Sequence, residues 1–406
     1  MEYIFTERAH LMCPNMCFGI VASVNKSFDR NLIEKTVEKL SAAHPFLRAL
    51  IACDEKANAY FYDVTDESKV EVIFAGKLGV GTSCVESNEI ISKYKSLVAS
   101  DWNLFDGGLL KIVAWDAGDK SAFLLVFHHL LADGRGALGL AQELADFYVH
   151  GKEPEEAVER LITKNDLPED SKLPFLSRSL VNSANKKWRK ENHGISYQDY
   201  HAFADDFLKT DSVNHTLVTV NQDELSALHS RCKSQGVSIN DYLLAKMFLE
   251  DKTERVIIAC DLRDKLACYN PGALGNYSTA FSVGLKKSCG DVFENAKRVH
   301  SIVRKKLNSP RDLYLVLQCY ASLEGGLLDA SLISSRGGFE SKAAKFIGTM
   351  FFNYGKANGY SITNLGKIES ESLEAAYFIP PASPAVRKTQ GVLTVNGTMR
   401  ICTAER

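Results

Sequence analysis

The sequence predicts a mixed α/β protein built from two sequentially ordered lobes of related architecture. Its 406 residues exceed the usual size of one domain. Patterns of strand and helix recur on both sides of a polar, charged stretch from about Gly151 to Asp211. We therefore expect an N-terminal lobe at 1–175, a connecting segment at 176–210 and a C-terminal lobe at 211–406.

The chain begins with a predicted strand, a helix and a second strand. Met16 to Val24 is apolar enough for a strand, and Phe28 to Leu40 carries apolar side chains at the spacing of one buried helix face. His44 and Pro45 should end that helix. Phe46 to Ile51 is then predicted to be another strand.

Two neighbouring strands and a helix are predicted around residue 130. Leu110 to Trp115 and Ser121 to Phe127 are apolar, and the residues Asp116 to Lys120 between them have turn chemistry. From Arg135 to Val149 the apolar positions follow helical spacing. A short loop therefore joins a strand to a helix at residues 128–134.

The second half of the sequence is predicted to repeat this pattern of strands and helices. His215 to Val220 alternates as a strand, and a helix is expected from Gln222 to Gln235. Another helix starts near Val237, where Ser238 or Asn240 can cap its free amide groups. The remaining predicted elements are strands at 254–259 and 278–283, a helix at 292–306, and final strands near 361 and at 391–401.

The composition excludes several classes of protein. The 48 basic and 50 acidic residues leave a formal charge of −2, so no global field attracts nucleic acid or an anionic membrane. No apolar run approaches the ~20 residues of a membrane span, and the N-terminus has no signal-peptide pattern, so we expect a cytoplasmic protein without a membrane span. The ten cysteines form no C-x-x-C pair and are expected to be reduced.

Several features receive structural interpretations. The basic run Lys186 to Lys190 is interpreted as a solvated face of the connecting segment rather than a phosphate site. Cys13 and Cys17 lack a second matching pair, so buried thiols are favoured over zinc, and no metal is predicted. No cysteine lies in a recognisable nucleophile motif. The isolated histidines, among them His10 and His44, are assigned surface or packing roles.

The chemical signal of the chain is the segment from His128 to Gly134, which reads His-His-Leu-Leu-Ala-Asp-Gly. Adjacent side chains of a strand point to opposite faces, so only one of the two histidines can face a given cleft. An imidazole accepts a proton near neutral pH and suits a base for an incoming hydroxyl or amine. We assign that role to His129 and a structural role to His128.

Asp133 has two interpretations on the residues alone. Asp133 can cap the helix that starts at Arg135, because a carboxylate accepts the free amide hydrogens of the first turn. It can also form a buried ion pair that holds the loop. With this ion pair, Gly134 would permit the tight turn.

The segment resembles the HHxxxDG motif of the acyltransferase superfamily that includes condensation domains, chloramphenicol acetyltransferase, alcohol acetyltransferases and polyketide-associated acyltransferases. Weaker matches are spread over nearly the whole chain. They are the stretches 40–48, 105–112, 237–241, 261–263, 275–276 and 361–366. The DFGWG segment of the plant BAHD enzymes is absent, which disfavours that branch.

The resemblance implies two chloramphenicol-acetyltransferase-like lobes with mixed sheets, arranged as a V, with an active-site tunnel between them that leads to His129. It also implies that Asp133 pairs with an arginine and supports the structure. Arg263 is the first candidate partner and Arg48 the second. The remaining matched residues, expected at the tunnel or the lobe interface, are Asn276, Thr363 and Asn364.

The implied function is transfer of an acyl group from a thioester to an alcohol or amine acceptor. The donor would be acyl-CoA or the acyl-phosphopantetheine arm of a separate carrier protein, as a co-substrate, with no tightly bound cofactor. The residues leave donor and acceptor open. The alternative function is a non-catalytic module that keeps the fold to bind a carrier protein or an acyl ligand; a test for acyl transfer separates the two.

Overall fold

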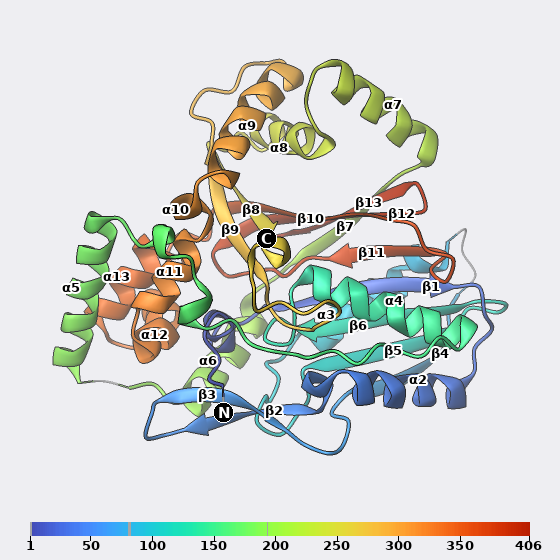
Figure 1. Cartoon of the computed structure of the whole chain (residues 1–406), viewed down its shortest axis with the longest axis horizontal. Helices are drawn as coiled ribbons and strands as arrows, with labels where there is room; N and C mark the ends of the chain where they lie inside the picture. The colour runs from blue at the N-terminus through green and yellow to red at the C-terminus, as the bar shows by residue number, and fades with distance from the viewer. Residues whose placement is uncertain (1, 80–82, 193) are drawn as a thin grey trace.

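A computed structural model describes residues 2–79, 83–192 and 194–406. Two mixed sheets, each covered by helices, lie next to each other, with a further group of helices at one side (Figure 1). This arrangement confirms the predicted mixed α/β class.

The first sheet has five strands and carries the histidine motif. Its order is β11 (Ala375–Ile379), β1 (Cys17–Val24), β6 (Ser121–His128), β5 (Leu110–Asp116) and β4 (Glu71–Lys77). Strand β6 is antiparallel to both of its neighbours, and Cys17 pairs with His128 at its end. All eight residues of β6 are buried. The motif therefore begins at the end of a central strand.

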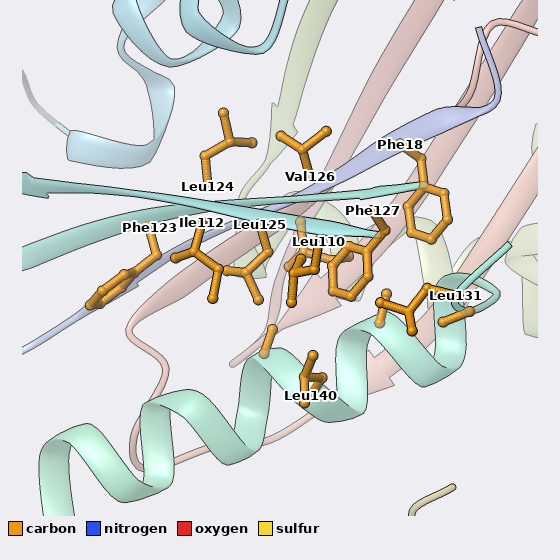
Figure 2. Packing of buried hydrophobic residues seen from close by; sticks show 14 of the residues in the cluster. Phe18, Leu110, Ile112, Phe123, Leu124, Leu125, Val126, Phe127, Leu131 and Leu140 are labelled. Atoms are coloured by element: carbon orange, nitrogen blue, oxygen red, sulfur yellow. The ribbon is translucent and has the colours of Figure 1, made fainter. Parts of the chain in front are cut away.

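Helices cover both faces of this sheet. Alternate side chains of β6, such as Phe123 and Phe127, point toward Leu140 on α4 (Gly134–His150), whereas Leu124 and Val126 point the other way (Figure 2). Helix α2 (Arg30–Ala43) packs against α4, and α3 (Asn88–Leu97) packs against β6. The alternation expected for a strand is thus present up to the histidines.

The second sheet has six strands. Its order is β7 (Asn214–Val220), β13 (Thr398–Glu405), β12 (Val386–Val395), β10 (Gly359–Ile368), β8 (Arg255–Asp261) and β9 (Ser278–Gly284). Three helices accompany it: α7 (Gln222–Ser234), α8 (Ile239–Glu250) and α9 (Val292–Leu307). Their apolar side chains and those of the sheet form a second core.

A helical group lies beside the sheets (Figure 1). Its members are α5 (Phe175–Glu191), α6 (Tyr197–Thr210), α10 (Pro310–Leu313), α11 (Leu315–Ser322), α12 (Gly325–Ser335) and α13 (Lys342–Met350). The short helix α1 (Arg8–Leu11) packs on α12, and the buried Arg8 pairs with Asp329 at 2.6 Å. A hairpin of β2 (Ala49–Asp54) and β3 (Ala59–Val64) completes the fold.

The predicted helices at 28–40, 135–149, 222–235 and 292–306 and the strands at 110–115, 121–127, 254–259 and 278–283 are confirmed. One element was wrong: Pro45–Arg48 is a turn of 3₁₀ helix, so the strand predicted from Phe46 begins only at Ala49. Proline at the first position of a helical turn favours this outcome, because its φ is already helical.

The lobe limits 1–175, 176–210 and 211–406 remain predictions, and two observations bear on them. The segment 176–210 holds most of α5 and all of α6 rather than an irregular connection. Strand β11, at residues 375–379, pairs with β1 in the first sheet and lies beside β12 of the second. The C-terminal part of the sequence thus supplies one strand of the first sheet.

Candidate active site

The motif occupies the junction between β6 and α4. Strand β6 ends at His128 and α4 begins at Gly134, so five residues form the connecting loop. The amide of His129 donates to the carbonyl of Met16 at 3.1 Å, which continues the strand pairing by one residue. Because of this extension, the two histidine side chains point to opposite sides.

Asn276 holds the His129 ring in one orientation. Its Nδ2 donates to the carbonyl oxygens of His129 at 2.8 Å and Leu130 at 3.2 Å, so its Oδ1 is the remaining acceptor. That oxygen lies 2.9 Å from His129 Nδ1. Since an amide oxygen only accepts, Nδ1 must carry the hydrogen, and the neutral ring keeps its lone pair on Nε2.

The environment keeps His129 uncharged near neutral pH. Burial lowers the pKa of the ring, while its own backbone carbonyl, Asp133, Asn276 and the carbonyl of Ala132 oppose this effect. The ring also has two aromatic neighbours. The Phe18 ring meets it edge-on with centroids 5.1 Å apart, and the His10 ring stacks on it at 4.3 Å. His129 is therefore a confined imidazole in its base form.

His128 points to the other side, where it lines a small cavity together with both polar and apolar residues. Its side chain is buried, its Nδ1 accepts from the amide of Leu130 at 3.3 Å, and its ring centroid lies 6.2 Å from that of Trp102. Burial, helped by the neighbouring His129, lowers the pKa of His128 to about 3. The ring therefore stays neutral throughout the physiological range, and the structural role expected for His128 remains a prediction.

Asp133 is both a helix cap and one half of an ion pair. Its Oδ1 accepts from the amides of Arg135 and Gly136, both at 3.0 Å. Arg263 donates to both carboxylate oxygens, at 2.8 and 3.0 Å, and the amide of Tyr277 donates to Oδ2 at 2.9 Å. Asp133 thus caps α4 and forms the ion pair at the same time.

The Asp133 cluster joins residues far apart in the chain. The amide of Asp133 donates to the carbonyl of Gly275 at 3.1 Å, so the loop is also bound through its backbone to the segment that carries Asn276. Arg263 is buried with Asp133, and its guanidinium lies over the Tyr269 and Tyr277 rings. Arg48 does not take part; it donates to the carbonyl of Thr65.

Gly134 lies against the end of the Leu365 side chain and has an ordinary backbone angle. Its φ is not in the left-handed region, but a Cβ at this position would lie 2.6 Å from a methyl carbon of Leu365. Leu365 belongs to β10, where Thr363 and Asn364 also lie. No hydrogen bond joins Thr363 or Asn364 to His129 within the described part of the chain. These two residues stand next to the site without contacting its base.

Two residues near His129 were not found by sequence reasoning. His10 had been assigned a surface or packing role, yet its ring covers one face of His129. Glu7, one helical turn earlier, is fully buried, and neither carboxylate oxygen makes a hydrogen bond of normal geometry to a described residue. Burial raises the pKa of Glu7 to about 7, against nearby polar groups that include the Asn276 amide.

The signal that could have revealed these residues is weak. Glu7 and His10 are three residues apart, which places them on one side of a helical turn, but nothing in the sequence indicates where that turn packs. Their position follows from the Arg8 pair with Asp329. That contact spans 321 positions of the chain, beyond the reach of local patterns.

His44 is also more than a packing residue. Its buried ring lies between two carboxylates, with Nε2 2.7 Å from Glu143 and Nδ1 3.1 Å from Glu159. These contacts raise the pKa of His44 to about 9 despite its burial. Glu159 also accepts from the amides of Phe46 and Leu274. The group links the first lobe to the segment just before Asn276.

Two cavities lie on the His128 side of the molecule. One, of about 240 Å³, is lined by residues of α3, α6 and β7, among them Tyr94 and His215. The second is small and reaches His128 and Trp102. His129 lines neither of them, so the tunnel expected beside it remains a prediction. Over residues 2–79, 83–192 and 194–406 no His, Cys, Asp and Glu side chains are grouped as metal ligands.

Known structures with the same fold include three that resemble the chain over nearly its full length. The condensation domain of the monacolin K polyketide synthase MokA has a TM-score of 0.59 at 12% identity, with 100% of this chain and 91% of that chain covered. Polyketide synthase associated protein 5 from Mycobacterium tuberculosis has a TM-score of 0.56 at 14% identity, covering 100% and 92%. SgcC5 from Streptomyces globisporus has a TM-score of 0.58 at 11% identity, with 99% of this chain and 93% of that chain covered.

At these identities the three structures establish the fold alone. A search of the curated proteins gave no sequence match. The family itself is established by the model of the condensation domain, which matches residues 17–253 and thus more than half of the 406 residues, including the whole histidine motif. The chain is therefore a member of the condensation-domain family, with the two-lobed mixed α/β fold of that family and a function of the condensation or acyl-transfer type.

Proposed function

We propose that this protein transfers an acyl group from a CoA or carrier-protein thioester to an alcohol or amine, with His129 as the general base. The observation that carries the proposal is the contact between His129 Nδ1 and Asn276 Oδ1. It leaves a neutral imidazole with its lone pair on Nε2, which is the form a base needs before reaction.

The proposed reaction takes place in two steps without an acyl-enzyme. His129 Nε2 removes the proton of the acceptor O–H or N–H as that oxygen or nitrogen attacks the thioester carbonyl. The tetrahedral intermediate then collapses, the C–S bond breaks, and the proton on Nε2 passes to the leaving thiolate. The products are an ester or amide and a free thiol, and the histidine returns to its starting form.

The positive charge that forms on His129 during the reaction lies near the negative charge of Asp133. Asp133 already favours the protonated ring, and its ion pair with Arg263 keeps the carboxylate in place. The electrostatic effect of fixed groups is large in a site that excludes water. We assign Asp133 a structural role with this electrostatic contribution, and Asn276 a positioning role through the ring tautomer.

The donor is proposed as a thioester because that group is common to acyl-CoA and to an acylated carrier protein. The acyl thioester and a small-molecule acceptor are the partners, with a carrier protein as the second donor form. No tightly bound cofactor takes part in the proposed steps. The small formal net charge of the chain, −2, is consistent with local recognition of either donor.

The test is a transfer assay with a panel of acyl-CoA and acyl-carrier-protein donors and candidate alcohols and amines. Release of free thiol is followed together with the mass of the acceptor, because hydrolysis releases thiol without an acylated acceptor. We expect an acceptor-dependent thiol release that produces the acylated acceptor. His229→Ala, an exposed histidine on α7, is the matched control for His129→Ala.

The alternative of a non-catalytic binding module makes a different prediction. Such a protein would bind an acylated carrier protein or acyl ligand with equal strength in the wild type and in His129→Ala, and neither would release thiol above the rate without protein. That result across the panel would remove the proposed function.

A further inference from the structure

One face of α5 combines large apolar side chains with lysines. Phe175, Leu176 and Leu180 keep 73%, 75% and 44% of their surface exposed, which is unusual for three such residues within six positions. Lys186, Lys187 and Lys190 are exposed further along the same helix. The interpretation of this basic run as a simple solvated surface does not account for the apolar residues next to it.

The helix has two distinct sides. Its buried side chains are Val181, Ala184, Asn185 and Trp188, and they belong to the helical group with α13. The outward side holds, at helical spacing, Phe175, Leu176, Ser179, Leu180, Ser183, Lys186, Lys187 and Lys190, all exposed. At ~100° per residue these eight positions fall within about 140° of the helix circumference. This outward face of α5 is amphipathic along its length, with an apolar first half and a basic second half.

Acidic side chains are missing from the outward face of α5. The residues from 175 to 190 include no aspartate or glutamate, and Glu191 at the end turns inward to bond Ser341 and the amide of Ala343. Among residues 2–79, 83–192 and 194–406, no carboxylate pairs with Lys186, Lys187 or Lys190. Three unpaired positive charges on a chain with a net charge of −2 are a local feature that fits an anionic partner.

We propose that the outward face of α5 binds the surface of an anionic phospholipid membrane. Phenylalanine and leucine enter the boundary between head groups and acyl chains, while lysines remain with the phosphates. Helix α5 lies at the outer edge of the molecule (Figure 1), where a flat lipid surface can reach its outward face. No helix in the described part of the chain is long and apolar enough to cross a bilayer.

This contact is separate from the proposed acyl transfer. Helix α5 belongs to the cluster of α11, α12 and α13, and none of its residues contacts His129 or the Asp133 ion pair. Loss of membrane binding is therefore expected to leave transfer between water-soluble substrates unchanged. A failure of one proposal does not affect the other.

The test is sedimentation of the full-length protein with vesicles of phosphatidylcholine alone or with about one third phosphatidylserine. We expect binding to the anionic vesicles that weakens as salt is raised. The variant Lys186→Glu/Lys187→Glu/Lys190→Glu should bind about a hundredfold less, at roughly fivefold for each lysine lost near an anionic surface. The variant Phe175→Ser/Leu176→Ser/Leu180→Ser should also lose binding, with its charge unchanged.

The control Lys35→Glu/Lys233→Glu/Lys305→Glu carries the same change in total charge on exposed lysines of α2, α7 and α9. It should bind at least tenfold better than the α5 lysine variant. Three outcomes overturn the proposal. They are no binding of the wild type to anionic vesicles, binding by both α5 variants that equals that of the wild type, or a wild-type dimer in light scattering that the serine variant converts to a monomer without any effect of lipid.

Discussion

His128 and His129 are neighbours in the sequence, but they occupy regions of opposite character. His128 lies on the α3 side beside Trp102, at a small cavity where no described side chain donates to or accepts from its ring, and its pKa falls to about 3. His129 lies on the other side, where Asn276 fixes its tautomer and Asp133 favours its charged form. The difference shows that the function of an imidazole depends on the polar groups which reach it across the fold, since residue type and position along the strand are nearly the same.

The largest expected effect tests the His129 side of this comparison. His129→Ala should lower kcat by about 10²- to 10⁴-fold, the contribution of a positioned general base. The fold should remain, because the Asp133 ion pair does not depend on the ring. Steady-state rates with an established donor and acceptor, together with circular dichroism, check both parts. Activity within a few-fold of His229→Ala would exclude His129 from the mechanism.

Asp133→Ala should have the next largest effect, on stability. Removal of this carboxylate leaves the exposed Asp261 as the remaining ion-pair partner of Arg263 and also removes the cap of α4. Breaking a buried ion pair commonly costs about 3 to 5 kcal/mol. Urea unfolding measures this loss. If the free energy of unfolding stayed at the wild-type value while turnover disappeared, Asp133 would have to act in the chemistry itself.

A smaller effect is expected for Asn276→Ala, which tests how the ring of His129 is oriented. The variant removes the acceptor of Nδ1 and two donors to backbone carbonyls, so kcat should fall roughly tenfold to a hundredfold. Asn31→Ala, at an exposed position on α2, is the control and should retain wild-type rates. Equal rates in the two variants would show that the tautomer does not depend on Asn276.

The smallest effect concerns the His128 side and the pH dependence of stability. A histidine whose folded pKa lies below its unfolded value of 6.5 binds a proton only in the unfolded chain as the pH falls. The contribution of such a neutral histidine to the free energy of unfolding is complete above pH 6.5 and decreases as the pH falls below 6.5. For His128 this predicts a loss of about 2 kcal/mol between pH 6.5 and 5.

The variant His128→Phe keeps an apolar ring and removes the titration. Its unfolding free energy should therefore decrease less steeply over that pH window than that of the wild type, while carboxylates contribute equally to both proteins. Urea unfolding at several pH values gives the comparison. Parallel pH profiles would mean that His128 is not held neutral by burial.

Local patterns predicted much of the first sheet and the helices. The strands around residues 112 and 124 and the helix after Gly134 follow from apolar periodicity, because a buried sheet face and one helix stripe impose those spacings directly. The two helices α5 and α6 were not predicted, since their charged composition conceals the narrow buried stripe of residues such as Val181 and Trp188. Strand β11 was missed too, being only five residues long.

The sequence by itself determined the motif, the opposite directions of its two histidines and the family that they indicate, because these depend on residue type and on the two-residue repeat of a strand. The tertiary structure decided which groups surround each histidine. Asn276 reaches His129 across 147 positions, Arg263 reaches Asp133 across 130, and His10 is placed by α1. Contacts over such separations arise from the packing of whole lobes, which no local spacing encodes.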